Sequence, residues 1–386
     1  MDTFGLTPGV ADVAEAVTAV PLVDHHCHGV ARGDLDRAGF EGFLSEGGPP
    51  APGETNFDAP VGIALRRYCA PVLDLPEHAR PEDYLARRQE LGAAEVTRRF
   101  MVASSSGALC VDTGFRPDEL LSAAETAAAA GARVHEIVRL EYLLEGLAAQ
   151  GLEAGELADR FAAALAAELA RPEVVGLKSI AAYRVGFDLD PTRPSADEVA
   201  SAADRWLRAG PGRSGWRVAD PVLARFLLWT AVDAGRPIQL HVGFGDADIR
   251  MHRVDPALLT DWLHAHRVPV MLLHCWPHHR TASYLAGVFP HVHLDLGLAM
   301  TYVGPSRAAT LLAEAAETTP FGRLLYSSDA FGLAEYYFLG AAVFRRAIAE
   351  VYGGMVDAGD WSPADAVRVA AMVAAGNARR VYGLDS

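Results

Sequence analysis

The sequence lacks the features that mark nucleic-acid-binding, membrane-spanning or disulfide-stabilised proteins. It has no block of basic residues and a formal net charge of -15, so a nucleic-acid or anionic-membrane partner is not expected. Its apolar runs are short and interrupted by charges, which argues against a transmembrane helix. The four cysteines have no CxxC spacing, which indicates reduced thiols rather than a disulfide framework or a zinc finger.

Two further absences narrow the class of protein. Residues 1–19 lack the basic and apolar regions of a signal peptide, so we expect a cytoplasmic protein. No glycine-rich dinucleotide or phosphate-binding motif follows an early strand, which argues against a doubly wound sheet. What the chain does have is apolar content. Hydrophobic residues make up 51% of its 386 residues, enough for one large α/β domain or two smaller ones.

Eight short apolar segments, nearly all separated by helical patterns, run along the chain. They lack strict alternation, as expected for strands that are buried on both faces. The predicted strands lie at 20–24, 108–112, 133–140, 174–180, 237–241, 268–274, 291–296 and 323–329. This βα pattern predicts a (β/α)8 TIM barrel. We expect residues 1–386 to form a single barrel domain, with a helical lid insertion at about 30–100 and C-terminal helices at about 335–386.

The segment Asp24-His25-His26-Cys27-His28 ends the first predicted strand. Alternate side chains of a strand share a face, so His26 and His28 point the same way and can bind one metal ion. Asp24, one step back on that face, can orient a ligand. A polar strand end that faces solvent has the same sequence pattern, so this segment alone leaves both interpretations open.

Residues that can bind metals also end other predicted strands. His241 ends the fifth strand, His274 the sixth and Asp329 the eighth, while Lys178 lies in the fourth. The carboxyl ends of barrel strands converge on one mouth, where active sites lie. A single histidine on an apolar run is more often a core residue, but this coincidence at several strand ends favours a metal site.

This set of residues resembles that of the amidohydrolase superfamily of metal-dependent hydrolases. The chain is most similar to the amidohydrolase-2 branch. Within it, the chain resembles the amidohydrolase-related half of nodulin-like and fungal proteins fused to a glutamine-synthetase-like domain. The resemblance covers nearly the whole chain and is carried by segments 176–184, 241–246, 282–286 with 293–295, and 326–329. We expect no synthetase half here, because only enough sequence for a small helical cap follows Asp329.

The resemblance implies roles for five residues. His26, His28 and His241 would bind a divalent metal ion, for which zinc is the first expectation and manganese the second. Asp329 would contact the metal and accept a proton from a metal-activated water. His274 would polarise the scissile carbonyl group or, alternatively, hold a second metal ion.

Lys178 decides between one and two metal ions. In two-metal members of the superfamily a lysine of the fourth strand is carboxylated and bridges the ions, and Lys178 occupies the matching strand. Alternatively, Lys178 binds a substrate carboxylate or balances the charge of Asp329, and Glu141 near the end of the third strand supplies a bridging acid. We expect one ion, with two as the alternative if Lys178 is carboxylated.

Three residues are candidates for substrate contacts. Arg184 follows the fourth strand and could clamp an anionic group, although a surface salt bridge is an equally good interpretation. Arg250 lies in the loop after the fifth strand, and Trp276 follows His274 directly. Trp276 could line the mouth of the barrel or pack the loop. His25 does not fall on the metal-facing set, and we interpret it as structural or exposed.

We therefore expect an enzyme, a hydrolase that cleaves the C–N bond of a small amide, lactam or γ-glutamyl compound. One alternative is a metal-dependent non-oxidative decarboxylase of a small carboxylic acid, because relatives in the same branch cleave C–C bonds. A second alternative is a non-catalytic, metal-stabilised binding protein, against which the complete ligand set argues. The expected partner is a small-molecule substrate, and formation of a homo-oligomer stays open.

Overall fold

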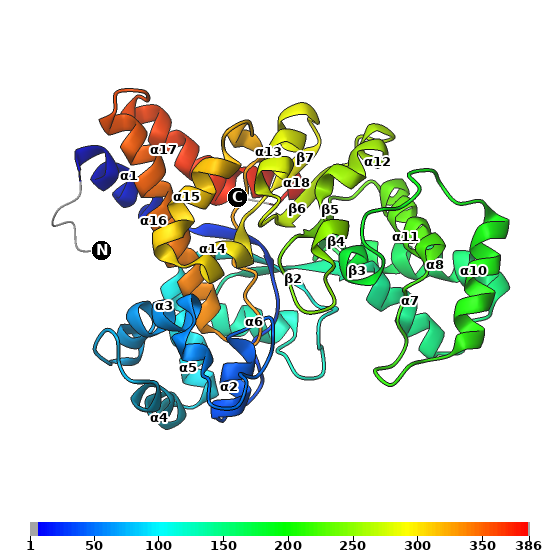
Figure 1. Ribbon diagram of the computed structural model, residues 1–386, viewed down its shortest axis with the longest axis horizontal. Helices are drawn as coiled ribbons and strands as arrows, with labels where there is room; N and C mark the ends of the chain where they lie inside the picture. The colour runs from blue at the N-terminus through cyan, green and yellow to red at the C-terminus, as the bar shows by residue number, and fades with distance from the viewer. Residues whose placement is uncertain (1–6, 385–386) are drawn as a thin grey trace. The chain divides into compact units, whose positions relative to one another are not determined.

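The computed structural model describes residues 7–384, and its seven strands form one sheet in chain order (Figure 1). The strands are β1 (Leu22–Cys27), β2 (Ser106–Asp112), β3 (Arg133–Arg139), β4 (Val174–Ser179), β5 (Ile238–Val242), β6 (Val270–His274) and β7 (Val292–Leu294). β1 pairs with β2 in parallel, as do the successive strands from β3 to β7. At least one α-helix lies between every two consecutive strands. The predicted α/β, TIM-barrel-like class is confirmed.

Helices make up most of the rest of the chain (Figure 1). They are α1 (Pro8–Ala19), α2 (Arg37–Phe43), α3 (Pro60–Tyr68), α4 (Pro81–Leu91), α5 (Ala93–Ser104), α6 (Ala123–Ala130), α7 (Leu140–Ala149), α8 (Leu157–Leu169), α9 (Ala181–Arg184), α10 (Ala196–Ala209), α11 (Pro221–Ala234), α12 (Thr260–His264), α13 (His279–Val288), α14 (Gly297–Val303), α15 (Pro305–Ala315), α16 (Glu335–Asp357), α17 (Pro363–Ala371) and α18 (Asn377–Tyr382). Within residues 7–384, no helix combines the length and the apolar character needed to cross a membrane.

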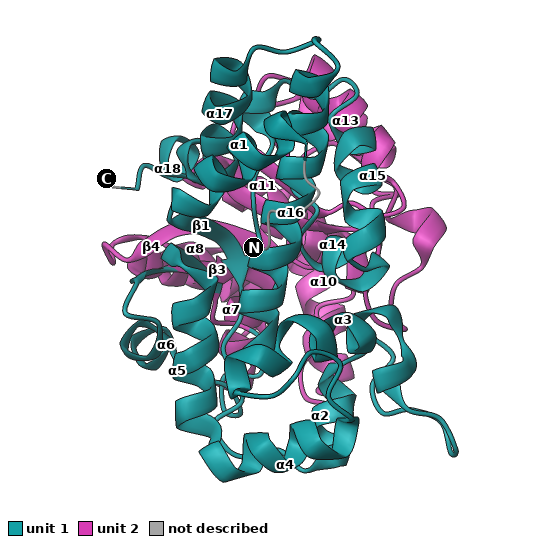
Figure 2. Cartoon of the chain, turned by 90° about the vertical axis from the view of Figure 1, so that its left-hand side faces the viewer, with its two compact units in different colours: residues 1–111, 115–135, 295–386 teal, residues 112–114, 136–294 magenta. Residues whose placement is uncertain are grey.

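The chain separates into two compact units, which Figure 2 colours differently. Unit 1 comprises residues 1–111, 115–135 and 295–386, and unit 2 comprises residues 112–114 and 136–294. Unit 1 therefore holds β1 and most of β2, and unit 2 holds β4 to β7. Each unit carries its own group of the residues that the sequence singles out.

The eighth predicted strand, residues 323–329, does not form a regular strand. It is nevertheless tied to β1 by the backbone, as an eighth barrel strand would be. The bonds run from His25 N to Tyr326 O (3.1 Å), from Asp329 N to His26 O (3.1 Å) and from His28 N to Ala330 O (2.7 Å). The left-handed backbone of Asp329, with φ +50°, is incompatible with strand geometry. This segment therefore sets Asp329 beside β1 without extending the ladder.

A capping signal explains where α6 begins. The Ser122 hydroxyl accepts a hydrogen bond from Glu125 N, and the Glu125 carboxylate accepts one from Ser122 N. This reciprocal pair satisfies two backbone donors that the first helical turn leaves without partners. The helix consequently begins at Ala123, directly after its N-cap Ser122.

The predicted lid insertion, residues 30–100, contains α2 to α4 and most of α5, and a buried ion pair anchors it within unit 1. Glu335 of α16, which is fully buried, accepts a hydrogen bond from Arg88 Nε at 2.6 Å and one from Tyr84 Oη at 3.1 Å. Breaking such a buried pair is costly, because it leaves an uncompensated charge. At α4, therefore, the insertion is part of the packed interior of unit 1. A lid function stays a prediction.

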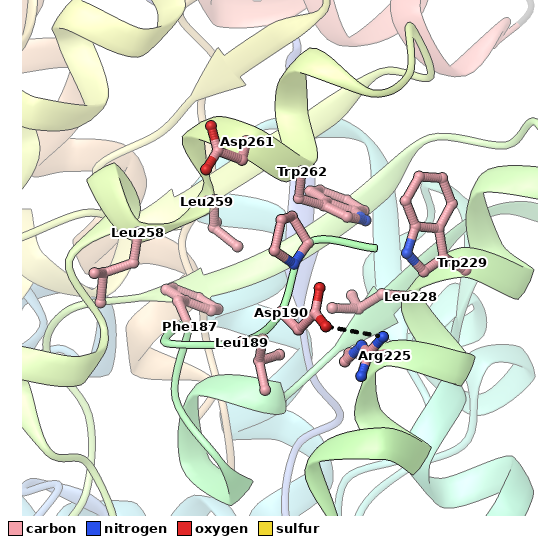
Figure 3. Close-up of a pocket in the computed structure, with 11 residues that line it drawn as sticks. Phe187, Leu189, Asp190, Arg225, Leu228, Trp229, Leu258, Leu259, Asp261 and Trp262 are labelled. Carbon is pink, nitrogen blue, oxygen red and sulfur yellow. Dashed lines mark ion pairs between the residues drawn. The ribbon is translucent and has the colours of Figure 1, made fainter. Parts of the chain in front are cut away.

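Unit 2 contains an apolar hollow on its helical side (Figure 3). The hollow has a volume of about 400 Å³, including the part open to solvent. Its lining includes Leu228 and Trp229 of α11 and Trp262 of α12, and the Arg225–Asp190 ion pair (3.5 Å) lies among the lining residues. None of the predicted site residues belongs to this lining, so the hollow is a separate feature.

Candidate metal centre

Two histidines at the end of β1 share one carboxylate oxygen in unit 1. His26 Nε2 lies 3.0 Å from Asp329 Oδ1, and His28 Nε2 lies 3.4 Å from the same atom. The two imidazole rings meet edge to face, with centroids 5.0 Å apart. All three residues are buried. Strand alternation places both rings on one face, as the sequence predicted, and the bond from Asp329 N to His26 O holds the carboxylate beside them.

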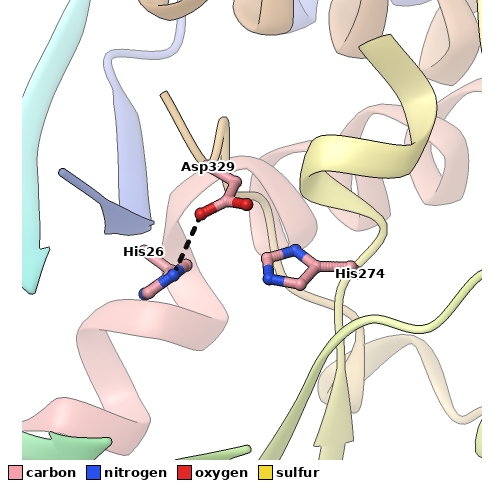
Figure 4. Close-up of side chains that lie close together, drawn as sticks. All are labelled: His26, His274 and Asp329. Carbon is pink, nitrogen blue, oxygen red and sulfur yellow. Dashed lines mark ion pairs between the residues drawn. The ribbon is translucent and has the colours of Figure 1, made fainter. Parts of the chain in front are cut away.

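Figure 4 shows His26 with its ion pair to Asp329, together with His274 of unit 2. Each of these buried residues offers one ligand atom of a kind that divalent metal ions accept. Asp329 and His274 also share an unusual backbone, with φ of +50° and +67°, and Cys275 follows with φ +59°. Left-handed backbone conformations are uncommon for residues other than glycine, and they persist only where the surrounding structure holds them. Such residues are found most often at functional sites.

Asp24 holds the segment that carries Asp329. Its carboxylate accepts hydrogen bonds from Ser328 N at 2.9 Å and from Ser328 Oγ at 2.5 Å. Burial raises the pKa of Asp24 to about 7, and the bonds from Ser328 oppose this shift. The sequence interpretation had Asp24 orient a metal ligand. In the structure its side chain contacts the residue next to Asp329, so it positions the Asp329 carboxylate through the backbone.

His25 belongs to a different network of unit 1. Its Nε2 lies 2.8 Å from Asp295 Oδ2, and its Nδ1 lies 3.1 Å from Tyr382 Oη. His25 and Asp295 are fully buried. This histidine therefore links β1 to the chain after β7 and to α18, which is a structural role. Adjacent residues of one strand thus serve two distinct purposes.

His241 and His274 are neighbours in unit 2, on the adjacent strands β5 and β6. Their ring centroids lie 4.7 Å apart. Tyr183 of α9 lies beside His241, with its hydroxyl 3.4 Å from Nδ1. Because Tyr183 engages Nδ1, Nε2 is the nitrogen of His241 that would bind a metal. Gly245 lies against the same ring, where a Cβ would come within 2.9 Å of Nε2, so a larger residue there would obstruct the ligand.

Lys178 is the only lysine of the chain. It lies within β4, where the register pairs it with Arg139 of β3 and Gln239 of β5, and only 2% of it is exposed. Burying an ammonium group is expensive unless partners stabilise its charge. A buried lysine in this strand therefore agrees with a role in the site.

Glu141, the alternative bridging acid, is bonded to the end of β4. Its Oε1 accepts hydrogen bonds from Ser179 Oγ at 2.6 Å and Ile180 N at 3.1 Å. Burial raises the pKa of Glu141, while these hydrogen bonds oppose the shift. At least one oxygen of this carboxylate therefore has a structural partner within unit 2.

The three candidate substrate residues lie in different surroundings. Arg184 is largely buried, with Nη2 3.5 Å from Glu145 Oε1, and loss of hydration lowers its pKa despite that neighbour. Arg250 is exposed and donates a hydrogen bond to a carbonyl oxygen of its own loop at 2.9 Å. Trp276 is 38% exposed and packs edge to face on Phe244. Arg184 therefore has the surroundings best suited to an anion.

Tyr183, Gly245 and Ser328 are functional candidates that the sequence interpretation missed. All three lie within segments that carry the family resemblance, but nothing in those segments indicates what they contact. Tyr183 is 58 residues from His241, and Ser328 is 304 residues from Asp24. Contacts over such separations depend on the fold.

A family model and a relative of known sequence match this chain. Residues 23–384 match the model of the protein family described as Amidohydrolase. Protein fluG of Emericella nidulans is 33% identical over 238 residues, which cover 58% of this chain and 27% of that protein, so the chain spans about a quarter of that relative's length.

Two solved structures extend the comparison. A protein of Lactobacillus casei ATCC 334, provisionally assigned as a metal-dependent hydrolase, superimposes with a TM-score of 0.84 and 29% identity over 96% of this chain and 97% of that one. Uronate isomerase of Thermotoga maritima matches with a TM-score of 0.67 and 14% identity over 99% of both chains, a likeness of fold alone.

Proposed function

The chain belongs to the amidohydrolase family, and from this membership we propose that it is a metal-dependent hydrolase acting on the C–N bond of a small amide, lactam or γ-glutamyl compound. The observation that carries the proposal is the meeting of His26 Nε2 and His28 Nε2 at one oxygen of Asp329. The likeness to the Lactobacillus casei protein supports it.

The proposed ligands are His26, His28, His241 and Asp329, the set that the family resemblance implies. Ligand atoms of a tetrahedral zinc ion lie about 3.4 Å apart, because each bond measures about 2.0–2.1 Å. The two separations from Asp329 Oδ1, 3.0 and 3.4 Å, fit that requirement. We propose zinc first and manganese second, as a single ion, and we place Lys178 among the substrate or electrostatic residues.

Asp329 and His274 would then have different roles in the reaction. A bound divalent ion would lower the pKa of a water molecule to about 7. Asp329 takes the proton of the attacking water as the oxygen–carbon bond forms. His274 donates a hydrogen bond to the carbonyl oxygen and stabilises the charge that develops there. Asp329 returns the proton to the leaving nitrogen as the C–N bond breaks, and an amine and an acid result.

Arg184 is proposed to bind a carboxylate of the substrate, such as that of a γ-glutamyl group. Its guanidinium is largely buried, and its neighbour Glu145 lies 3.5 Å away, at the long end of hydrogen-bonding distance. Burial of this kind favours an additional anion that would compensate the charge. Arg250 and Trp276 are proposed as weaker contacts, because both lie at the surface.

The test is a product analysis of the metal-loaded protein with N-acyl amides, γ-glutamyl amides and small carboxylic acids. We expect an amine and an acid as new products. The Asp329→Asn variant should retain its metal content, and its rate should be about 10²–10⁴-fold lower than that of the wild type. The exposed Asp360 provides a matched control, so Asp360→Asn should leave the rate unchanged. Release of CO₂ without an amine would establish the decarboxylase instead. Metal binding without turnover of any compound would favour a binding protein.

A further inference from the structure

We propose that a wall of aromatic rings beside His28 receives an apolar, ring-bearing group of the substrate. The aromatic wall consists of Phe43, Phe115, Tyr302, Phe331 and Tyr336, all of unit 1. The inference rests on the proposed function in one respect, because it takes the edge formed by His28 and Asp329 as the place of reaction. It adds the chemical class of the group next to the scissile bond.

The rings of the aromatic wall form a continuous series that starts at the candidate ligand. Phe115 contacts the imidazole of His28, and Phe331 connects Phe115 to the remaining rings. The centroid distances are 4.9 Å for His28–Phe115, 6.2 Å for Phe115–Phe331, 6.1 Å for Phe331–Phe43, 5.6 Å for Phe331–Tyr336 and 6.3 Å for Tyr336–Tyr302. Such separations are typical of interacting aromatic pairs. A ligand at His28 would therefore have an aromatic surface next to it.

The backbone fixes Phe331 in this position. Hydrogen bonds on both sides of it join its loop to residues 28–31: Ala330 O accepts from His28 N, and Gly332 both donates to and accepts from that segment. Gly332 has φ +68°, and a Cβ there would come within 2.2 Å of the Phe43 ring. Only glycine therefore allows Phe43 and the loop to approach this closely. A surface that is ordered before binding lowers the entropic cost of holding a ligand.

Exposure separates three of the five rings of the aromatic wall from ordinary core packing, while Phe43 and Tyr336 are buried. Phe40 and Phe57 of the same unit stack on each other and are fully buried. Phe115, Phe331 and Tyr302 are only partly buried. Rings that contribute to packing alone gain most by complete burial. Partly exposed rings beside a buried polar centre leave an apolar surface available to a small molecule, as in most ligand sites.

The polar groups that contact the aromatic wall have partners within the protein. Tyr336 Oη donates a hydrogen bond to Phe43 O at 2.9 Å and lies 3.4 Å from Tyr302 Oη, so these hydroxyls are directed at each other and at the backbone. The Arg116 guanidinium lies 5.1 Å from the centroid of Phe43. That guanidinium is ion-paired with the Glu119 carboxylate, so its charge is already balanced within the protein. A neutral ring is the ligand that the surface fits.

The test compares phenylacetate with acetate as ligands of the metal-loaded protein, by titration calorimetry. The two share a carboxylate and differ by the ring, so we expect phenylacetate to bind at least about tenfold more tightly. Phe331→Ala should remove most of that difference and leave the Kd of acetate within about twofold. Phe331→Leu repeats the test with packing volume retained, and circular dichroism confirms that each variant is folded. Equal affinities in the wild type, or equal weakening of both ligands, would overturn the proposal.

Tyr284→Ala provides the matched control. It removes an aromatic ring on α13 that is 58% exposed and lies outside the aromatic wall. Its affinities should equal those of the wild type, and a loss of the phenylacetate preference there would indicate non-specific binding to surface rings and overturn the proposal.

Binding does not require turnover, so failure of the aromatic wall and failure of the proposed hydrolase activity can be told apart. Selective binding of phenylacetate without hydrolysis of any amide would uphold the aromatic wall and reject the hydrolase. Hydrolysis of acetyl and phenylacetyl amides at equal kcat/KM would uphold the hydrolase and reject the aromatic wall.

Discussion

Two groups of histidines in this protein have similar burial but different neighbours. His26 lies near the carboxyl end of β1, His28 follows that strand directly, and both contact a carboxylate. His266 and His291 precede the amino ends of β6 and β7 and meet rings, with His266 4.3 Å from the Trp262 centroid and 5.4 Å from that of His291. Burial therefore does not identify a metal ligand. The end of the strand and the presence of a carboxylate distinguish the two groups.

Replacing both His26 and His28 by alanine tests the first group and should have the largest effect. The pair supplies two of the four proposed ligands, and the affinity of a metal site depends on its ligand count and charge. We expect no metal to co-purify with the variant, measured by elemental analysis of folded protein. His266→Phe and His291→Phe should retain the wild-type metal content. Retention of metal by the double variant would show that His26 and His28 are not metal ligands and do not differ from His266 and His291 in this respect.

His25→Leu tests whether His25 has a structural role, in contrast to the proposed metal-binding role of its neighbour His26. The substitution leaves the Asp295 carboxylate buried without its imidazole partner, at 2.8 Å in the native protein. Removing one member of a buried pair costs about 3–5 kcal/mol, so the free energy of unfolding should fall by that amount. Denaturant titration measures it. Folded His25→Leu should still bind metal stoichiometrically, and loss of metal without loss of stability would contradict its structural role.

The second group predicts a pH effect on stability. Burial, with the nearby His291 and Arg267, lowers the pKa of His266 to about 4 from an ordinary value of 6.5. The unfolded chain therefore binds a proton below pH 6.5, and the folded chain does not until about pH 4. Stability is full above pH 6.5 and falls as the pH drops through this window, by at most about 3 kcal/mol for this residue.

His266→Phe should remove that part of the pH dependence while keeping a ring against Trp262. The measurement is the unfolding free energy of the wild type and the variant at pH 7.5 and pH 4.5, so that the contributions of all other groups cancel in the difference. An equal acid-induced loss in both proteins would show that His266 titrates normally.

The comparison also shows how far the sequence could lead. Apolar periodicity located the seven strands, and the spacing of His26 and His28 was enough to place both on one face. Periodicity failed at residues 323–329, because the bonds from Ser328 to Asp24 and the left-handed Asp329 override an extended conformation. The two compact units had no sequence signal either. Their boundaries fall at or within β2, β3 and β7, where no linker composition occurs.

The chemical context of each histidine was less predictable than its position. Asp329 was placed near β1 by the family resemblance, but the link from His25 to Asp295 spans 270 residues and follows from no local pattern. Strand alternation can state which residues share a face, and it cannot state which side chain from elsewhere meets them. That information comes from packing between distant segments.

Tyr183→Phe should have the smallest effect of these variants, and it tests whether a hydrogen-bonding partner distinguishes His241 from histidines that only pack against rings. The variant keeps the ring 4.4 Å from the His241 centroid and removes only the hydroxyl near Nδ1. Partners that orient a ligand contribute about 10–100-fold to metal affinity, and the long 3.4 Å contact places this one at the lower limit. We expect about tenfold weaker binding in a competition titration against a chelator, with unchanged stability of the metal-free protein. Tyr142, exposed on α7, supplies the control Tyr142→Phe. Equal affinity in both variants would mean that the Tyr183 hydroxyl does not orient His241, and that packing against the neighbouring rings is sufficient.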